Sequence, residues 1–71
     1  MTRREEWSVK ARMPDAAAAD RLVGRLAASG RNVGRLGRRV SIAASDQRDA
    51  QTLAGELELL HPDARIEVRG D

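Results

Sequence analysis

The sequence contains no cysteine, tyrosine or phenylalanine, and it has one tryptophan and one histidine. Without cysteine there is no disulfide framework, no thiolate nucleophile and no cysteine-based zinc site. No apolar run approaches the roughly 18 residues that a membrane span requires. Residues 1–6 lead into a strand pattern and not into the apolar core of an export signal. These absences predict a cytoplasmic protein with no cofactor, no metal site and no membrane span.

The sequence contains few residues of the types that usually perform catalysis. Acid–base catalysis by two carboxylates needs a pair whose surroundings push their pKa values apart, and the acidic residues here fall mainly on expected helix surfaces and strand edges. The one imidazole, His61, stands at the end of an expected helix, where a cation interacts favourably with the helix dipole. We interpret His61 as a capping residue and not as a metal ligand or general base, and we expect a protein that is not an enzyme.

The chain of 71 residues suffices for one domain, close to the lower size limit for folding without disulfides or metals. Because its expected core is thin, a dimer is a reasonable hypothesis. The net charge is only +2, but basic residues dominate before residue 40 and acidic residues after it. Either the basic and acidic halves neutralise each other where they are in contact, or the asymmetry indicates an oriented interaction surface.

Hydrophobic periodicity predicts six elements. Strands are expected over residues 6–13, 31–35, 39–44 and 65–69, with a turn at 36–38. One helix is expected from the N-cap Asp15 to Gly30, and another from Ser45-Asp46 to just before Pro62. The side chains expected in the core are Trp7, Val9, Met13, Leu22, Val23, Leu26, Val33, Val40, Ile42, Leu53, Leu57, Leu60, Ile66 and Val68. Leu59 is out of phase with this stripe and is expected to be exposed.

A shift of 31 positions brings Val9 onto Val40 and Asp15 onto Asp46. The chain therefore reads as one domain, 1–71, made of two strand–helix–strand halves at about 7–35 and 39–69. Two right-handed units of this kind interleave most simply into a four-stranded antiparallel sheet with both helices on one face. The predicted fold is the ferredoxin-like βαββαβ sandwich of the α+β class, with the first and third strands adjacent at the sheet centre.

The open face of such a sheet is expected to be basic, because the outward residues of its central strands are lysine, arginine, serine and alanine. More arginines surround the central hairpin. The residues predicted to bind a partner or an anion are Lys10, Arg12, Arg31, Arg35, Arg38 and Arg39. Phosphate contacts from such a patch would weaken steeply with salt and read no base sequence.

Two nucleic-acid-binding folds share features with the chain. The segment Gly34-Arg-Leu-Gly37 has the GxxG spacing of KH domains, but that loop joins two helices, and here a strand pattern follows it. RRM domains stack bases on aromatic residues of strands one and three, whereas Trp7 is expected to point into the core. We interpret the GxxG segment as a hairpin turn.

The order of patterns also resembles the sporulation-related repeat (SPOR) domains, which bind peptidoglycan glycan strands. The shared features are Trp7-Ser-Val9 opening strand one, an alanine-rich helix ending in Ala27-Ala-Ser-Gly30, and Arg39-Val-Ser-Ile42 before a second Ala/Leu helix. The chain departs from the family at Lys10, where glutamine is usual, and at Arg12, where glycine is usual. The resemblance implies a ferredoxin-like fold.

The expected function is that of a small non-catalytic binding module, which presents the basic hairpin and the open sheet face to a protein or anionic partner. A protein partner or self-association is the first expectation. The alternatives are a nucleic-acid binder that uses phosphate contacts, a SPOR-like glycan binder and a dimeric sensor of a small ligand.

Overall fold

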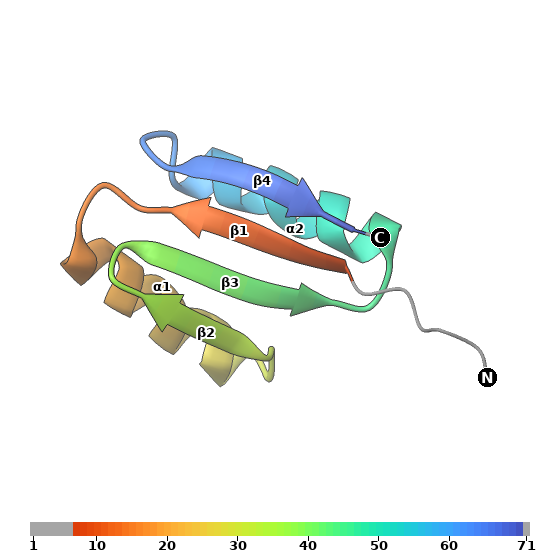
Figure 1. Cartoon of the computed structure of the whole chain (residues 1–71), viewed down its shortest axis with the longest axis horizontal. Coiled ribbons are helices and arrows are strands. Elements are labelled where there is room, and N and C mark those ends of the chain that lie inside the picture. The colour runs from red at the N-terminus through yellow and green to blue at the C-terminus, as the bar shows by residue number, and fades with distance from the viewer. Residues whose placement is uncertain (1–6, 71) are drawn as a thin grey trace.

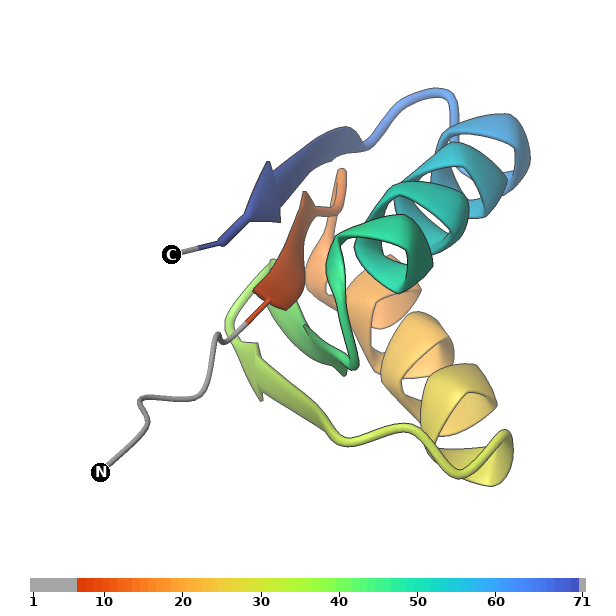
Figure 2. The ribbon, with the colours of Figure 1, turned by 90° about the vertical axis from the view of Figure 1, so that its right-hand side faces the viewer.

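The computed structural model describes residues 7–70 and has the element order βαββαβ. The elements are β1 (Trp7–Arg12), α1 (Ala16–Ala28), β2 (Val33–Leu36), β3 (Arg39–Ala44), α2 (Gln47–Leu60) and β4 (Arg65–Arg69). The strands pair antiparallel in the order β2-β3-β1-β4, with both helices on one face of the sheet (Figure 1, Figure 2). The predicted ferredoxin-like α+β fold is confirmed. Glu6, where the first strand was expected to begin, lies outside the described residues.

Each helix begins at an aspartate N-cap in extended conformation. The Asp15 carboxylate accepts a hydrogen bond of 2.7 Å from the Ala18 N–H, and the Asp46 carboxylate accepts one of 2.8 Å from the Asp49 N–H. These bonds satisfy amide groups that the first helical turn leaves without an intrahelical partner. Both N-caps were predicted, and they are the two aspartates that the 31-residue shift superimposes.

The chain leaves α1 through a left-handed glycine. Gly30 has φ +84°, its N–H donates to the Ala27 carbonyl, and the next N–H, that of Arg31, donates to the Leu26 carbonyl. This pair of bonds is the Schellman motif, which closes a helix and reverses the chain. Because the motif uses the residues just after the helix, β2 begins at Val33, two residues later than predicted.

A two-residue turn joins β2 to β3, since Leu36 pairs with Arg39. Gly37 has φ +63°, whereas Arg38 has a negative φ, the combination of a type II′ hairpin turn. The interpretation of the GxxG segment as part of a hairpin is therefore confirmed, although Leu36, which was expected in the turn, is the last residue of β2.

The core lies between the sheet and the two helices. Its buried residues are Val9, Ala11, Met13, Ala19, Leu22, Leu26, Val40, Ile42, Ala50, Leu53, Ala54 and Leu57, with Trp7, Val23, Val33, Ile66 and Val68 partly buried against them. The prediction of Leu60 as a core residue is wrong, because its side chain is 55% exposed. The inner stripe of α2 runs through Leu53 and Leu57, and its next position is His61, so Leu60 falls to one side.

We predict opposite effects for two glycine-to-alanine substitutions. A Cβ at Gly70 would overlap the Trp7 ring, whereas a Cβ at Gly24 meets no atom within 4 Å. Gly70→Ala should displace the ring, shift the tryptophan emission to the red and lower the free energy of unfolding by about 1 kcal/mol. Gly24→Ala should leave the emission unchanged and raise that free energy by about 0.5 kcal/mol. Urea unfolding followed by fluorescence measures both, and equal effects of the two substitutions would contradict this account of Trp7.

Candidate anion-binding face

The face of the sheet opposite the helices carries no helix (Figure 2). Side chains alternate between the two faces of a strand, and the apolar residues of β1 and β3 point into the core. Lys10 and Arg12 of β1 therefore lie on the open face, next to Arg39 and Ser41 of β3. Lys10, Arg12 and Arg39, three of the predicted binding residues, are exposed there together.

Strand register places three arginines side by side. Arg12 on the central strand pairs with Arg39 of β3 on one side and with Arg65 of β4 on the other. We call these three residues the arginine row. It lies where β1 ends and β3 and β4 begin, at the left of the sheet in Figure 1. Adjacent strands are about 4.8 Å apart, so the backbones of the three arginines lie within about 10 Å of one another.

A depression of about 450 Å³ adjoins the arginine row on the open face. The next row of paired residues supplies Lys10 of β1, flanked by Ser41 and by Glu67. The residues lining the depression are Lys10, Ala11, Arg12, Arg39, Arg65, Ile66 and Glu67. Four cations and one carboxylate thus surround it, a net formal charge of +3.

Within residues 7–70, the four cations of the depression make no side-chain hydrogen bond and no salt bridge. Its one carboxylate, that of Glu67, lies 3.5 Å from the guanidinium of Arg69 on the same strand. Like charges directly opposite one another on a sheet are destabilising. The arginine row therefore holds positive charge that an anion from outside the described chain could neutralise.

Arg35 of β2 and Arg38 of the β2–β3 turn are engaged elsewhere. The Arg35 guanidinium donates to the carbonyls of Ala16, at 3.3 Å, and Gly37, at 3.5 Å. The Arg38 guanidinium donates to the carbonyl of Pro14 at 3.2 Å. The bonds to Pro14 and Ala16 fasten the hairpin to the connection after β1 and to the start of α1. Arg35 and Arg38 therefore serve the fold, and neither lines the depression.

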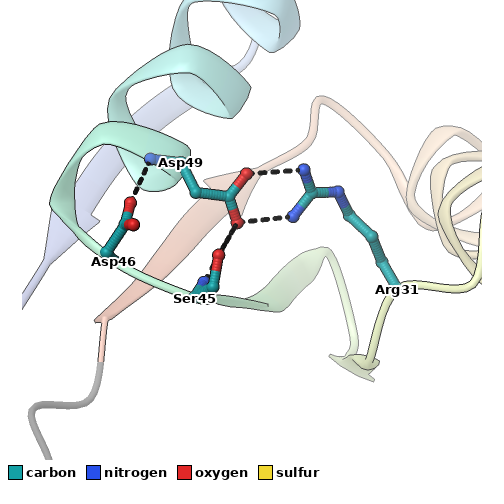
Figure 3. A network of polar contacts seen from close by, with 4 residues as sticks. All are labelled: Arg31, Ser45, Asp46 and Asp49. Carbon is teal, nitrogen blue, oxygen red and sulfur yellow. Dashed lines mark hydrogen bonds and ion pairs between the residues drawn. The ribbon is translucent and has the colours of Figure 1, made fainter.

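Arg31 lies in a separate polar network at the start of α2 (Figure 3). Its guanidinium binds both carboxylate oxygens of Asp49, at 2.9 and 3.2 Å, and these side chains are only 29% and 26% exposed. The same carboxylate accepts bonds from the N–H and hydroxyl of Ser45. The hydrogen bonds from Arg31 and Ser45 hold the pKa of Asp49 well below its usual value, and the bond to Asp49 raises the pKa of Arg31. Arg31 thus links the segment before β2 to the start of α2.

The structure therefore brings together only part of the predicted set. Lys10, Arg12 and Arg39 share the open face, whereas Arg31, Arg35 and Arg38 bind other parts of the chain. Sequence reasoning missed Arg65. The signal was available, because inward Ile66 and Val68 turn Arg65 outward, and a ferredoxin-like sheet places its fourth strand beside its first.

The described residues offer few other sites. Across 7–70, no group of three or more His, Asp or Glu residues is placed to hold a metal ion. Neither α1 nor α2 is long and apolar enough to cross a membrane. His61 is the C-cap of α2 through its backbone N–H, which donates to the Leu57 carbonyl at 2.8 Å, while its Nε2 is buried without a partner.

Comparison of the chain with known protein families, with curated proteins and with solved structures finds no match. No family match supports the resemblance to SPOR domains. What the resemblance shares with this structure is the βαββαβ order and the four-stranded sheet. The open face itself must therefore carry any functional inference.

We predict that the Arg31–Asp49 pair makes stability sensitive to acid. Because the folded-state pKa of Asp49 is lowered, its stabilising effect is complete above the unfolded pKa of about 3.9 and is lost as the pH falls below it. Asp49→Asn should lower the free energy of unfolding by about 1–2 kcal/mol at neutral pH and flatten its decline between about pH 5 and 2. Arg31→Gln should flatten the same decline, since the pKa of Asp49 then rises. Urea unfolding across this range measures both, and wild-type acid slopes in the two variants would contradict the prediction.

Proposed function

We propose that the protein is a small non-catalytic binding module whose open sheet face binds an anionic partner. The binding residues are the arginine row, Arg39, Arg12 and Arg65, together with Lys10. The observation that carries this proposal is the register, which aligns three arginines from three adjacent strands, none of which has a side-chain partner within residues 7–70. An anion bound across the row would relieve their mutual repulsion and stabilise the fold.

The chemistry of the row favours oxyanions. A guanidinium presents a planar fork of N–H donors that matches the oxygens of a phosphate or carboxylate. Arginine is always charged near neutral pH, so the row attracts anions without any change of protonation. Ser41 and Lys10 add donors beside the row. Because these side chains stand on paired strands and not on loops, their backbones are positioned before the partner arrives.

The composition of the face argues against partners that are recognised by stacking. The sole aromatic residue, Trp7, packs against the core from the other face of the sheet. Base stacking, which supplies much of the affinity of single-strand binders, therefore has no platform. A nucleic acid would be held by its phosphates alone, and nothing on this face favours the glycan that a SPOR-like protein would bind.

We predict that anions perturb the open face in a way that depends on Arg12. An amide NMR titration with tripolyphosphate, a short single-stranded oligonucleotide and an oligoglutamate peptide should shift Lys10–Arg12, Arg39–Ser41 and Arg65–Glu67 with at least one of them. The shifts should persist at about 0.15 M salt. Arg12→Gln should weaken that binding about tenfold, because charge-assisted hydrogen bonds are lost.

Arg21→Gln is the matched control, since Arg21 is exposed on α1, in the helical layer. It should bind like the wild type. If no anion of the panel shifts the open face at the higher salt, or if Arg12→Gln and Arg21→Gln behave alike, the proposal is wrong.

A second candidate function is self-association along β2. This strand is at the sheet edge, and its Leu36 is 81% exposed on the open face. An edge strand presents backbone groups that can pair with another chain. The opposite edge strand, β4, presents Arg65, Glu67 and Arg69 on that face, charges that discourage such pairing.

We predict that any dimer depends on Leu36. Sedimentation of the wild type should then show a mass that rises with concentration, and Leu36→Lys should abolish the rise. Leu59→Lys is the control, because Leu59 is 86% exposed on α2, which packs against β4 and β1 on the side of the sheet away from β2 (Figure 1). A wild type that stays monomeric, or equal effects of both substitutions, would rule out this second function.

A further inference from the structure

We infer that the depression beside the arginine row is a site for a compact polyanion, a small molecule that carries two or more adjacent phosphate groups. This inference rests on the proposed function and narrows it, because it names the class of anion. The inference rests on three features: positive charge gathers at one end of the open face, it does not continue along the strands, and the depression has the size of a small-molecule site.

Positive charge is concentrated at one end of the open face. The arginine row spans only about 10 Å across three strands, and Lys10 stands one row behind it. The four cations and Glu67 give the depression a net formal charge of +3. A diphosphate monoester carries about three negative charges near neutral pH, because its inner phosphate carries one and its terminal phosphate about 1.5 to 2. The charge of the site therefore matches one such group.

The positive charge does not continue along the strands. In the next row Lys10 is opposite Glu67, and in the row beyond it Ser8 is opposite Ala43 and Arg69. Arg69 is already close to Glu67, at 3.5 Å. An extended nucleic-acid strand running along the sheet would leave the arginine row and meet a carboxylate. The layout therefore favours a compact anion over a long one.

The size of the depression agrees with a small ligand. Its volume of about 450 Å³ lies in the range of about 300–1,000 Å³ that small-molecule sites occupy. Two phosphates can each face a guanidinium fork, with Arg12 between its two neighbours. The rest of the ligand then lies over Ser41 and Glu67, whose oxygens can accept hydrogen bonds from hydroxyl or amino groups.

The test is an amide NMR titration of the whole chain with inorganic pyrophosphate, orthophosphate and a short oligothymidylate, at about 0.15 M salt and without divalent cations. Pyrophosphate should bind at least tenfold more tightly than orthophosphate and more tightly than the oligonucleotide. Its shifts should centre on Arg12, Arg39 and Arg65. Arg65→Gln should weaken pyrophosphate binding about tenfold, since one guanidinium fork is lost, and Arg21→Gln should not change it.

A second variant separates the local charge of the site from the overall charge of the protein. Glu67→Gln removes the one carboxylate of the depression and should tighten pyrophosphate binding several-fold. Glu58→Gln removes an exposed carboxylate of α2 and should have no effect. Equal effects of these two substitutions would show only long-range attraction and would overturn the inference.

The remaining outcomes distinguish this inference from the proposed function. If the oligonucleotide binds the open face in an Arg65-dependent way and pyrophosphate binds no better than orthophosphate, the compact-anion site is wrong and an anion-binding face remains. If none of these anions shifts the face at this salt concentration, the compact-anion site is wrong, and if tripolyphosphate and oligoglutamate also fail to shift it, the proposed function is wrong as well.

Discussion

The pairing of β1 with both β3 and β4 is the constraint on which the rest of the structure depends. Because β1 is central, its inner residues Val9 and Ala11 lie at the middle of the core, and its outer residues lie at the middle of the open face. The register of β1 therefore determines both which side chains enter the core and which lie on the open face. A slip by one residue would move Arg12 into the core and Ala11 to the surface, so burial of the apolar face holds the arginines in line.

Holding three arginines in line has an energetic consequence. The free energy gained by burying apolar surface is large and roughly proportional to the area buried. The repulsion between exposed guanidinium groups amounts to only about 1 kcal/mol or less per directly opposed pair. The core can therefore impose an arrangement that the charges oppose. Natural proteins give up stability of this kind at functional sites, and this is the physical basis for proposing the arginine row as a binding surface. Arg31, by contrast, forms an ion pair with Asp49.

Much of the fold could be predicted from the sequence. So could three of the four binding residues, although only half of the six residues that the sequence predicted belong to the site. The period of apolar residues and the aspartate caps determine the kind and order of the elements, and alternation places Lys10, Arg12 and Arg39 on one face. The role of Arg31 could not be predicted, because its partner Asp49 is 18 residues away and is reached only after folding. Arg35 donates to backbone carbonyls, which leave no trace in a side-chain pattern.

The central claim is that the three guanidinium groups of the arginine row repel one another and that a bound anion removes this repulsion. The most direct test is a double-mutant cycle of Arg12→Gln and Arg39→Gln, which follows the free energy of unfolding in dilute chloride and again with saturating pyrophosphate. In chloride, each substitution should stabilise the protein, and the double variant should gain less than the sum of the two, because the same repulsion is removed once. With pyrophosphate, each substitution should destabilise it. Additive effects of one sign under both conditions would contradict the account.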